Sequence, residues 1–414
     1  MQRANLRHLH TFREVARLGS VSAAARAVHM SQPAVTQAIS GLERFFGSPL
    51  LRRRNTGVSL TPAGEVCLAR IERSLLQLRD ALVEATRGAG VDVQRLIRAT
   101  QLDALGSVVE HGNFSIAARA RRLSQPSIHR AARELERLLG VALFEKTSFG
   151  LRPTRDAENL ARRARLAFAE IDQARAEVHA LSGAECGRTV IGALPLARSY
   201  LLPAALLEFT QLHPRHGVAI IDGTYEHLLA GLRLGESDLV VGALRDPVPA
   251  NDVVQEHLFD DPLALVCRAG HPLTRTRRVT LASLRKYQWI APRAGSPLRV
   301  HFDTLMSAAG LAAQGPPLEC NSLAAARAFL LESDRVMLMS AHQIHYEMQA
   351  GVLAALPHPA GRVVRPIGLT LRRDWRPTAN QQTLLEILRR SARAAAASHA
   401  SLGLAQPRAR QVLA

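Results

Sequence analysis

The sequence is poor in lysine, in aromatic residues and in long apolar stretches. Lys146 and Lys286 are the only lysines among 53 basic residues, and aromatic residues make up 4% of the chain. No run of about 18 apolar residues occurs, and the opening residues, MQRANLRHLHTF, contain no apolar core of a signal peptide. These absences predict a protein that is neither secreted nor membrane-spanning, and therefore a cytoplasmic one.

Cysteine is also scarce. The four cysteines, Cys67, Cys186, Cys267 and Cys320, are far apart, with no C-x-x-C pair and no histidine cluster at metal-ligand spacing. We expect buried free thiols in a reducing compartment, and neither a metal nor another cofactor. A redox-sensing role for one cysteine is the alternative.

Acidic residues are too few to balance the basic ones. With 35 acidic residues the formal net charge is +18, which favours a nucleic acid or another anionic surface as partner. An arginine-rich genome would explain arginine in place of lysine, but not the excess over acids. Apolar residues make up 47% of 414 positions, so we expect a folded chain of two to four domains.

The first half contains an internal repeat. Residues 19–47 align without a gap on residues 112–140, with 14 of 29 positions identical. The apolar spacing predicts three helices in each copy, and residues 49–62 a two-stranded hairpin after the first. Glycine should end the first helix, serine should cap the second and third, and proline should stand in the third helix's first turn. These residues are Gly19, Ser22, Ser31 and Pro33 in the first copy, and Gly112, Ser115, Ser124 and Pro126 in the second.

Such helices also occur in ordinary bundles, but the residues are more specific. The first copy contains S-x-A-A-R-x-x-x-x-S-Q-P-A-V, L-E-R-x-x-G, L-L-R-R and L-T-P-A-G. It resembles the N-terminal winged helix-turn-helix domain of the LysR-type transcriptional regulators, from about Asn5 to Glu65. The second copy keeps S-Q-P and L-E-R-L-L-G, but has His129-Arg130 in place of Thr36-Gln37 and P-T-R in place of L-T-P. Its base preference is therefore expected to differ or to be lost.

The resemblance implies which side chains contact DNA. The third helix of each copy would enter the major groove and reach base edges, while the hairpin, or wing, would contact phosphates. Arg130 would pair with guanine or contact only a phosphate. The expected DNA-binding residues are Ser31, Gln32, Pro33, Thr36, Gln37, Arg52, Arg53 and Arg54 in the first copy, and Ser124, Gln125, His129, Arg130 and Lys146 in the second.

A long helix with an apolar seam is expected after each wing. The seams comprise Leu68, Ile71, Leu75, Leu78, Leu82 and Ala85, then Leu160, Ala164, Ala167, Ile171, Ala174, Val178 and Leu181. Because this helix carries dimerisation in the family, the resemblance implies a homodimer or homotetramer. Either helix could pair with a copy of itself, and the alternative is a seam packed only onto its own chain.

The second half alternates strand-like and helix-like segments from about residue 186, which predicts an α/β domain with a largely parallel sheet. The strings SDLVVGAL, PRAGSPLR and SLAAARAFLLESDRVMLMS resemble the LysR effector-binding domain, a two-lobed relative of type 2 periplasmic binding proteins. The string RPIGLTLRRDWRPT resembles the equivalent segment in the sub-branch of LysR-type regulators whose members sense sugars and aromatic acids.

The ligand in such a domain is expected at the carboxyl ends of the strands, and hydroxyls with an arginine would suit a carboxylate. The alternative is that Ser296 and Asn321 only cap helices and that Arg198 is a surface charge. The expected effector-binding residues are Leu196, Arg198, Ser199, Thr224, Ser296 and Asn321.

The expected architecture is multidomain, with two tandem all-α winged helix-turn-helix domains and a two-lobed α/β domain. The expected boundaries are 1–62 and 95–155 for the DNA-binding domains, 63–90 and 156–182 for the linker helices, 186–390 for the effector domain and 391–414 for a flexible tail.

The expected function is a sequence-specific transcription regulator that binds double-stranded DNA and an anionic or sugar-like effector, with RNA polymerase as a candidate partner. An enzyme is not expected, because the sequence has no G-x-S-x-G elbow and no phosphate-binding glycine loop. The alternatives are a transport binding protein, and a sequence-indifferent architectural DNA-binding protein with a vestigial sensor domain.

Overall fold

The computed structural model describes residues 3–54, 57–88, 95–148, 150–183, 187–311 and 316–401. The chain forms two compact units. The first extends to Arg188, with the short pieces 215–217 and 233–236, and the second comprises the remainder from Thr189 onward. Cys186 and residues 402–414 lie outside the described residues.

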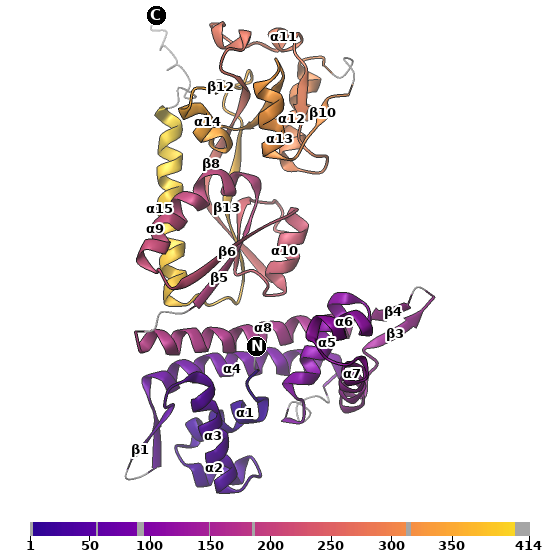
Figure 1. Cartoon of the computed structure of the whole chain (residues 1–414), viewed down its shortest axis with the longest axis vertical. Coiled ribbons are helices and arrows are strands. Elements are labelled where there is room, and N and C mark those ends of the chain that lie inside the picture. Colours follow the sequence, from indigo (N-terminus) through magenta and orange to yellow (C-terminus); the bar gives the residue numbers. More distant parts are fainter. Residues whose placement is uncertain are drawn as a thin grey trace, which may run out of the picture. The chain divides into compact units, whose positions relative to one another are not determined.

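The first unit contains two copies of one series of elements (Figure 1). Every element of the second copy begins 93 positions after its counterpart, so the repeat extends well beyond the segment that the sequence alignment detected. The first copy comprises α1 Leu6–Leu18, α2 Val21–Ala27, α3 Gln32–Phe46, β1 Leu51–Arg54, β2 Gly57–Leu60 and α4 Pro62–Ala85, and the second comprises α5 Ala99–His111, α6 Phe114–Arg121, α7 Gln125–Leu139, β3 Phe144–Thr147, β4 Gly150–Pro153 and α8 Arg155–Leu181.

We call α1–α3 with β1–β2 the first head, and α5–α7 with β3–β4 the second head. In both, the first helix ends at a left-handed glycine, Gly19 or Gly112, as predicted. Ser31 and Ser124 cap α3 and α7, which is also confirmed. The prediction for the second helix was wrong. Its caps are Ser20 and Asn113, because each precedes the helix and its side-chain oxygen accepts N–H bonds from the first turn.

One glutamate fixes the wing in each head. The Glu43 Oε1 atom accepts the backbone N–H of Leu50 at 2.9 Å, and Glu136 Oε1 accepts that of Leu143 at 2.9 Å. The two strands then pair antiparallel, β1 with β2 and β3 with β4, which confirms the hairpin of the first copy. The orientation of the wing against the third helix therefore rests on the same contact in both heads.

The long helices α4 and α8 lie side by side in one chain (Figure 1). Asn159 of α8 donates a hydrogen bond to Glu84 of α4, and Arg163 donates one to Gln77. Near the other end, Arg70 of α4 donates to Glu177 of α8. Residue numbers therefore rise along α8 as they fall along α4, so the two helices run antiparallel. Both predicted seams are largely buried, with Leu68 only partly so. Leu181 was wrongly placed in its seam, since it is 56% exposed at the end of α8.

The second unit is built on one mixed sheet with the strand order β10-β9-β11-β8-β13-β7-β5-β6, and β12 pairs with β8. The 16-residue strand β8 pairs with β13 over Val253–Pro262 and with β11 over Leu263–Val266. It therefore passes from one lobe to the other. The strands are β5 Gly187–Ala193, β6 His216–Asp222, β7 Leu239–Ala243, β8 Val253–Arg268, β9 Trp289–Ala291, β10 Leu318–Glu319, β11 Val336–Ser340, β12 Leu353–Pro357 and β13 Val364–Arg372.

The prediction of a largely parallel sheet was wrong. β5 is parallel to β7, and β9 to both β10 and β11, but β13 is antiparallel to both β7 and β8. β8 is also antiparallel to β11 and β12, so these antiparallel pairs all involve β8 or β13. The principal helices are α9 Leu202–Leu212, α10 Tyr225–Arg233, α11 Leu281–Leu284, α12 Pro297–Ala308, α13 Leu323–Leu331, α14 His345–Gln349 and α15 Ala379–Ser401.

The expectation of a flexible tail from residue 391 was wrong for its first part. Helix α15 continues to Ser401, and Ala392 and Ala395 are fully buried in the core of the first lobe. An alanine-rich segment shows little apolar periodicity in the sequence, but its small side chains can be buried where a helix packs closely against its neighbours. None of the described helices is long and apolar enough to cross a membrane.

Candidate nucleic-acid interface and ligand cleft

The third helix of the first head presents a polar face to solvent. Val35, Ile39 and Leu42 are buried, whereas Thr36 and Gln37 are exposed, as the helical spacing predicted. Ser31, Gln32 and Pro33 at the start of the helix are exposed as well. The predicted base-reading residues therefore share one accessible surface.

The second head presents the equivalent face with different side chains. The Ser115 hydroxyl donates to Gln125 Oε1 at 2.9 Å, and the His129 ring lies with its centroid 5.1 Å from that of Phe114. Arg130 is exposed, and its guanidinium makes no hydrogen bond or ion pair with the described residues. Of the predicted side chains on this helix, Arg130 is the one least engaged within the protein.

The wings differ in charge. Arg52, Arg53 and Arg54 are exposed on β1, where Arg52 Nε donates to the Leu60 carbonyl and Arg54 Nε to the Ser59 hydroxyl. The equivalent positions on β3 hold glutamate, Lys146 and threonine, and Lys146 is exposed. The first wing thus carries three cations on β1, whereas the second carries Lys146 beside an acid on β3 and the exposed Arg152 on β4.

The second head has a cation that the sequence analysis missed. Arg122 follows α6 in a left-handed conformation, with φ of 54°, and is exposed shortly before α7. His29 holds the equivalent position in the first head, with φ of 52°. The sequence does contain a signal for this cation: two arginines stand at residues 121–122, where the first head has valine and histidine.

The predicted effector residues do not form one site. Leu196 is 3% exposed and belongs to the core of the first lobe, so its role is packing. Arg198 is exposed and forms an ion pair with Asp222 at 2.5 Å. The Ser199 hydroxyl donates to the Pro195 carbonyl at 3.2 Å.

Two of the remaining candidates are helix caps. Ser296 accepts the Arg299 N–H at the start of α12, and the Thr224 hydroxyl accepts the His227 N–H before α10. Asn321 is exposed, but the cap of α13 is its neighbour Ser322. The cap alternative therefore describes Ser296 but not Asn321.

Glu226, close to Thr224, is affected by charges of both lobes. A hydrogen bond from its own backbone lowers the pKa of Glu226, as do the Thr224 hydroxyl and the charges of Arg245 and Arg293. Glu226 and Arg245 belong to the first lobe and Arg293 to the second. Charges from both lobes therefore act on Glu226.

Arg245 is the side chain that the sequence analysis missed at this place. Its guanidinium lies over the Tyr225 ring, 4.2 Å from the centroid, and its Nη1 atom is buried with no hydrogen-bond partner in the described structure. Burial lowers the pKa of Arg245, and the charge of Arg365 lowers it further. A carboxylate would satisfy such a desolvated donor.

Arg365 lies on β13 where β8 crosses between the lobes. Its Nε donates to Asp261 at 2.9 Å, and the Ser340 hydroxyl of β11 donates to the same fully buried carboxylate at 2.6 Å. The Nη2 atom of Arg365 is buried and without a hydrogen-bond partner in the described part of the chain. Two guanidinium donors therefore remain unsatisfied beside the inter-lobe crossing.

The described cysteines are free. Cys67 and Cys267 are buried, as predicted, and Cys320 is half-buried. Burial raises the pKa of both buried thiols, that of Cys267 to about 12. Because the thiolate is the reactive form, these two buried cysteines are poorly suited to redox sensing.

Comparison with known proteins identifies the family. A model described as the LysR substrate binding domain matches residues 182–393, and one described as bacterial regulatory helix-turn-helix protein, lysR family, matches residues 6–65 and 99–158. The HTH-type transcriptional regulator GalR of Pseudomonas putida is 38% identical over 368 residues, covering 89% of this chain and 92% of GalR. The chain belongs to the LysR family of transcription regulators.

A second relative agrees with this assignment, and a solved structure shares the fold. The HTH-type transcriptional regulator PcaQ of Agrobacterium fabrum is 32% identical over 72% of this chain and 96% of PcaQ. A full-length OxyR variant from Pseudomonas aeruginosa has a similar fold, with a TM-score of 0.50 and 23% identity over 71% of this chain and 94% of OxyR. This LysR-family chain is thus a DNA-binding transcription regulator with an effector-binding domain, and its relatives are regulators rather than enzymes.

Proposed function

We propose that this LysR-family regulator reads DNA with both heads, each a winged helix-turn-helix domain. The supporting observation is the common frame: the reading helices α3 and α7 start at equivalent positions, have the same cap and expose the same face. The base-reading residues are Gln32, Thr36 and Gln37 in the first head and Gln125, His129 and Arg130 in the second, with Arg52–Arg54 and Lys146 on phosphates.

Sequence-specific binding separates this function from that of an architectural protein. We expect the full chain to bind a duplex from the upstream region of its own gene at least about 1,000-fold more tightly than a random duplex. Titrations of both duplexes at two salt concentrations measure this ratio. Equal affinity for the two would favour the architectural function.

We infer that the effector is an anion, bound between the lobes near Arg245. Arg245 replaces Arg198 as the leading candidate, because Arg198 is already neutralised by Asp222 whereas Arg245 has an unsatisfied buried donor. Thr224 and Arg293 act on the same carboxylate, Glu226, as Arg245 does. A sugar acid or an aromatic acid fits this chemistry, because its carboxylate would accept the Arg245 donor and its ring would pack beside Tyr225.

A panel of sugar and aromatic carboxylates tests the site by calorimetry. Arg245→Ala should weaken the best ligand roughly 10- to 100-fold, because a charge-assisted hydrogen bond is removed. Arg198→Ala is the matched control and should leave the affinity within about threefold. If only Arg198→Ala weakened the ligand, Arg198 rather than Arg245 would be the residue that binds it.

A DNA-binding regulator of this kind is expected to act in the cytoplasm, as a homodimer or homotetramer, with RNA polymerase as a candidate partner. The effector domain is the expected place for contacts between chains, because the seams of the described α4 and α8 are already paired within one chain.

A further inference from the structure

The contacts between α4 and α8 repeat themselves with the partners exchanged. Arg70 donates to Glu170 at 2.8 Å. Arg163, which lies 93 positions after Arg70, donates at 2.5 Å to Gln77, which lies 93 positions before Glu170. The helices are therefore related by a local pseudo-twofold axis, as two identical subunits would be in an isologous dimer.

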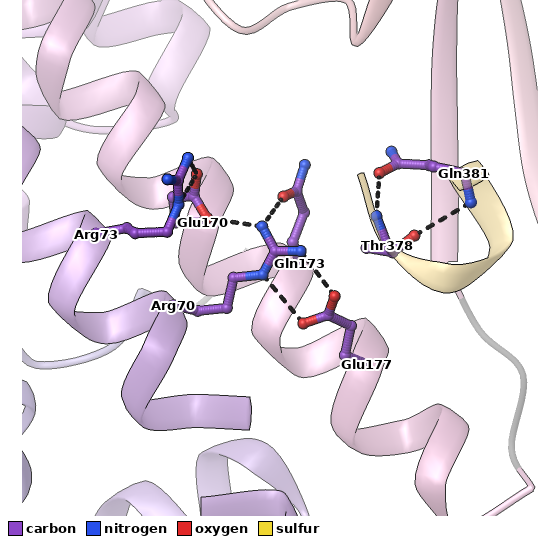
Figure 2. A network of polar contacts seen from close by, with 7 residues as sticks. All are labelled: Arg70, Arg73, Glu170, Gln173, Glu177, Thr378 and Gln381. Carbon is purple, nitrogen blue, oxygen red and sulfur yellow. Dashed lines mark hydrogen bonds and ion pairs between the residues drawn. The ribbon is translucent and has the colours of Figure 1, made fainter. Parts of the chain in front are cut away.

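The two halves of this pairing are no longer equal. Figure 2 shows Arg70 surrounded by Glu170, Gln173 and Glu177 of α8, with Arg73 also on Glu170. The Arg70 side chain is 6% exposed and that of Glu170 is 11% exposed. On the other side of the axis Arg163 meets the neutral amide of Gln77.

This inequality favours pairing α4 with α8 over pairing α4 with another α4. In a pair of two α4 helices, Gln77 would take the place of Glu170 beside Arg70, and a buried guanidinium would lose its buried carboxylate. A pair of two α4 helices is therefore disfavoured.

Side-chain size favours the same pairing. The register set by the Glu84–Asn159 and Gln77–Arg163 contacts brings Leu82 level with Ala161. The buried positions of both helices mix large and small residues, so the fit depends on which positions meet. The position of α4 that is equivalent to Ala161 holds Leu68, 93 residues earlier. A large residue against a small one fills a helix interface, whereas in a pair of two α4 helices Leu82 would meet Leu68 and overpack it.

The antiparallel pair holds the heads at opposite ends. The first head is joined to the start of α4 and the second to the start of α8, and antiparallel helices begin at opposite ends. The 24 residues of α4 span about 36 Å at 1.5 Å each, and half-sites one DNA turn apart are separated by about 34–36 Å. The helix pair thus has the length needed to serve two consecutive half-sites.

We propose that one chain is an internal dimer that recognises an asymmetric operator: two unlike half-sites about one helical turn apart, read in fixed order by the two heads of the same chain. The inference rests on the proposed function in that both heads bind DNA. It adds that no second chain is needed to supply the second head, and that the operator is not a palindrome.

A cross-link tests the pairing without DNA. In the full chain carrying Gln77→Cys and Arg163→Cys, a short bifunctional thiol reagent should join the two helices with no change in mass beyond the reagent. Each single variant is the control and should give no internal link. A product of twice the mass would show that α4 pairs with α8 of another chain, and no link would show that the pair does not form; either result overturns the inference.

Selection from a random-core duplex library tests the operator. The full chain should enrich two unlike half-sites in one order and at one spacing, and Arg130→Gln should change the consensus of only one of them. A palindromic consensus would overturn the inference, because it requires the same head twice. If no sequence is enriched, the proposed function fails and the operator claim with it, while the cross-link still judges the pairing.

Discussion

The two heads share a frame and differ on the surface that the frame presents. Glu43 and Glu136 hold their wings through the same backbone bonds, and Ser31 and Ser124 cap the reading helices alike. The exposed cations are distributed differently: three lie on β1 in the first head, whereas the second has Lys146 and Arg152 on its wing and Arg122 and Arg130 near or on α7. The residues that shape the fold are thus retained after duplication, while those that would touch DNA have diverged.

This difference separates affinity from specificity. Cations on a wing contact phosphates and act on any sequence, whereas an arginine on a reading helix can pair with a particular base. If both heads bind DNA as proposed, the three arginines of the first wing would act on any sequence, and Arg130 of the second head would pair with guanine. Variants that alter one head or one helix at a time test this division, beginning with the helices that join the heads.

The largest effect is expected at the helix pair. Arg70→Ala takes one guanidinium from Glu170, which keeps Arg73, and one from Glu177, and should lower the free energy of unfolding of the first unit by about 3 kcal/mol. Denaturant unfolding followed by circular dichroism measures the change. Arg163→Ala, at the equivalent position, removes only a contact with a neutral amide and should cost about 1 kcal/mol. Equal effects would mean that the two sides of the pair are energetically alike.

The wings should differ next. Replacing Arg52, Arg53 and Arg54 by alanine should weaken binding to specific and random DNA alike and lower the salt dependence, by roughly 0.9 in slope for each phosphate that is no longer neutralised. Lys146→Ala in the second wing should lower the slope by about one. Fluorescence titrations over a salt series provide both values. A change confined to the specific duplex would show that this wing reads sequence.

The reading helices provide the sharpest comparison of specificity. Arg130→Gln gives the second head the residue of the first, and should cost about 1–3 kcal/mol at the preferred base while relaxing the choice there. Thr36→Ala with Gln37→Ala should change the preference of the other half-site instead. Competition with single-base operator variants resolves the two effects. A uniform weakening on every sequence would indicate that Arg130 contacts only a phosphate.

A smaller difference lies at a buried position. Both ring nitrogens of His10 are buried without a hydrogen-bond partner in the described structure, and burial, with the charges of Arg13 and Arg95, lowers the pKa of His10 to about 4. The second head has Asp103 here, which forms ion pairs with Arg3 and Arg121.

The sign of the pH effect follows from the lowered pKa. Above pH 6.5 His10 is neutral in both states, so its effect is absent; between pH 6.5 and about 4 only the unfolded chain takes up the proton, and stability falls. Replacing His10 by leucine should reduce this acid destabilisation by roughly 1–2 kcal/mol, measured by thermal unfolding over a pH series. An unchanged profile would mean that other groups, such as Glu14, govern this range.

Much of the first unit could be predicted from local sequence signals. Ser31 and Ser124, each one position before a helix with proline in its first turn, gave the start of both reading helices correctly. Ser22 and Ser115 misled, because several capping residues stand near the start of the second helix and periodicity does not choose among them. Ser20 and Asn113 cap because they are the last residues outside the helix.

The tertiary partners could not be predicted in the same way. The seams of α4 and α8 have the same period, so nothing local indicates that they pair with each other rather than with copies of themselves. Arg198 was chosen because it follows the first strand, but Asp222, far along the chain, neutralises it. Arg245 stood out only once folding had buried one of its donors beside Arg365.

Footprinting with one head disabled at a time tests the central claim most directly. On the selected operator, the Thr36→Ala, Gln37→Ala chain should lose protection of one half-site, and the His129→Ala, Arg130→Ala chain should lose protection of the other. Loss of the same half-site in both variants, or equal loss over both half-sites, would contradict an operator read by two unlike heads of one chain.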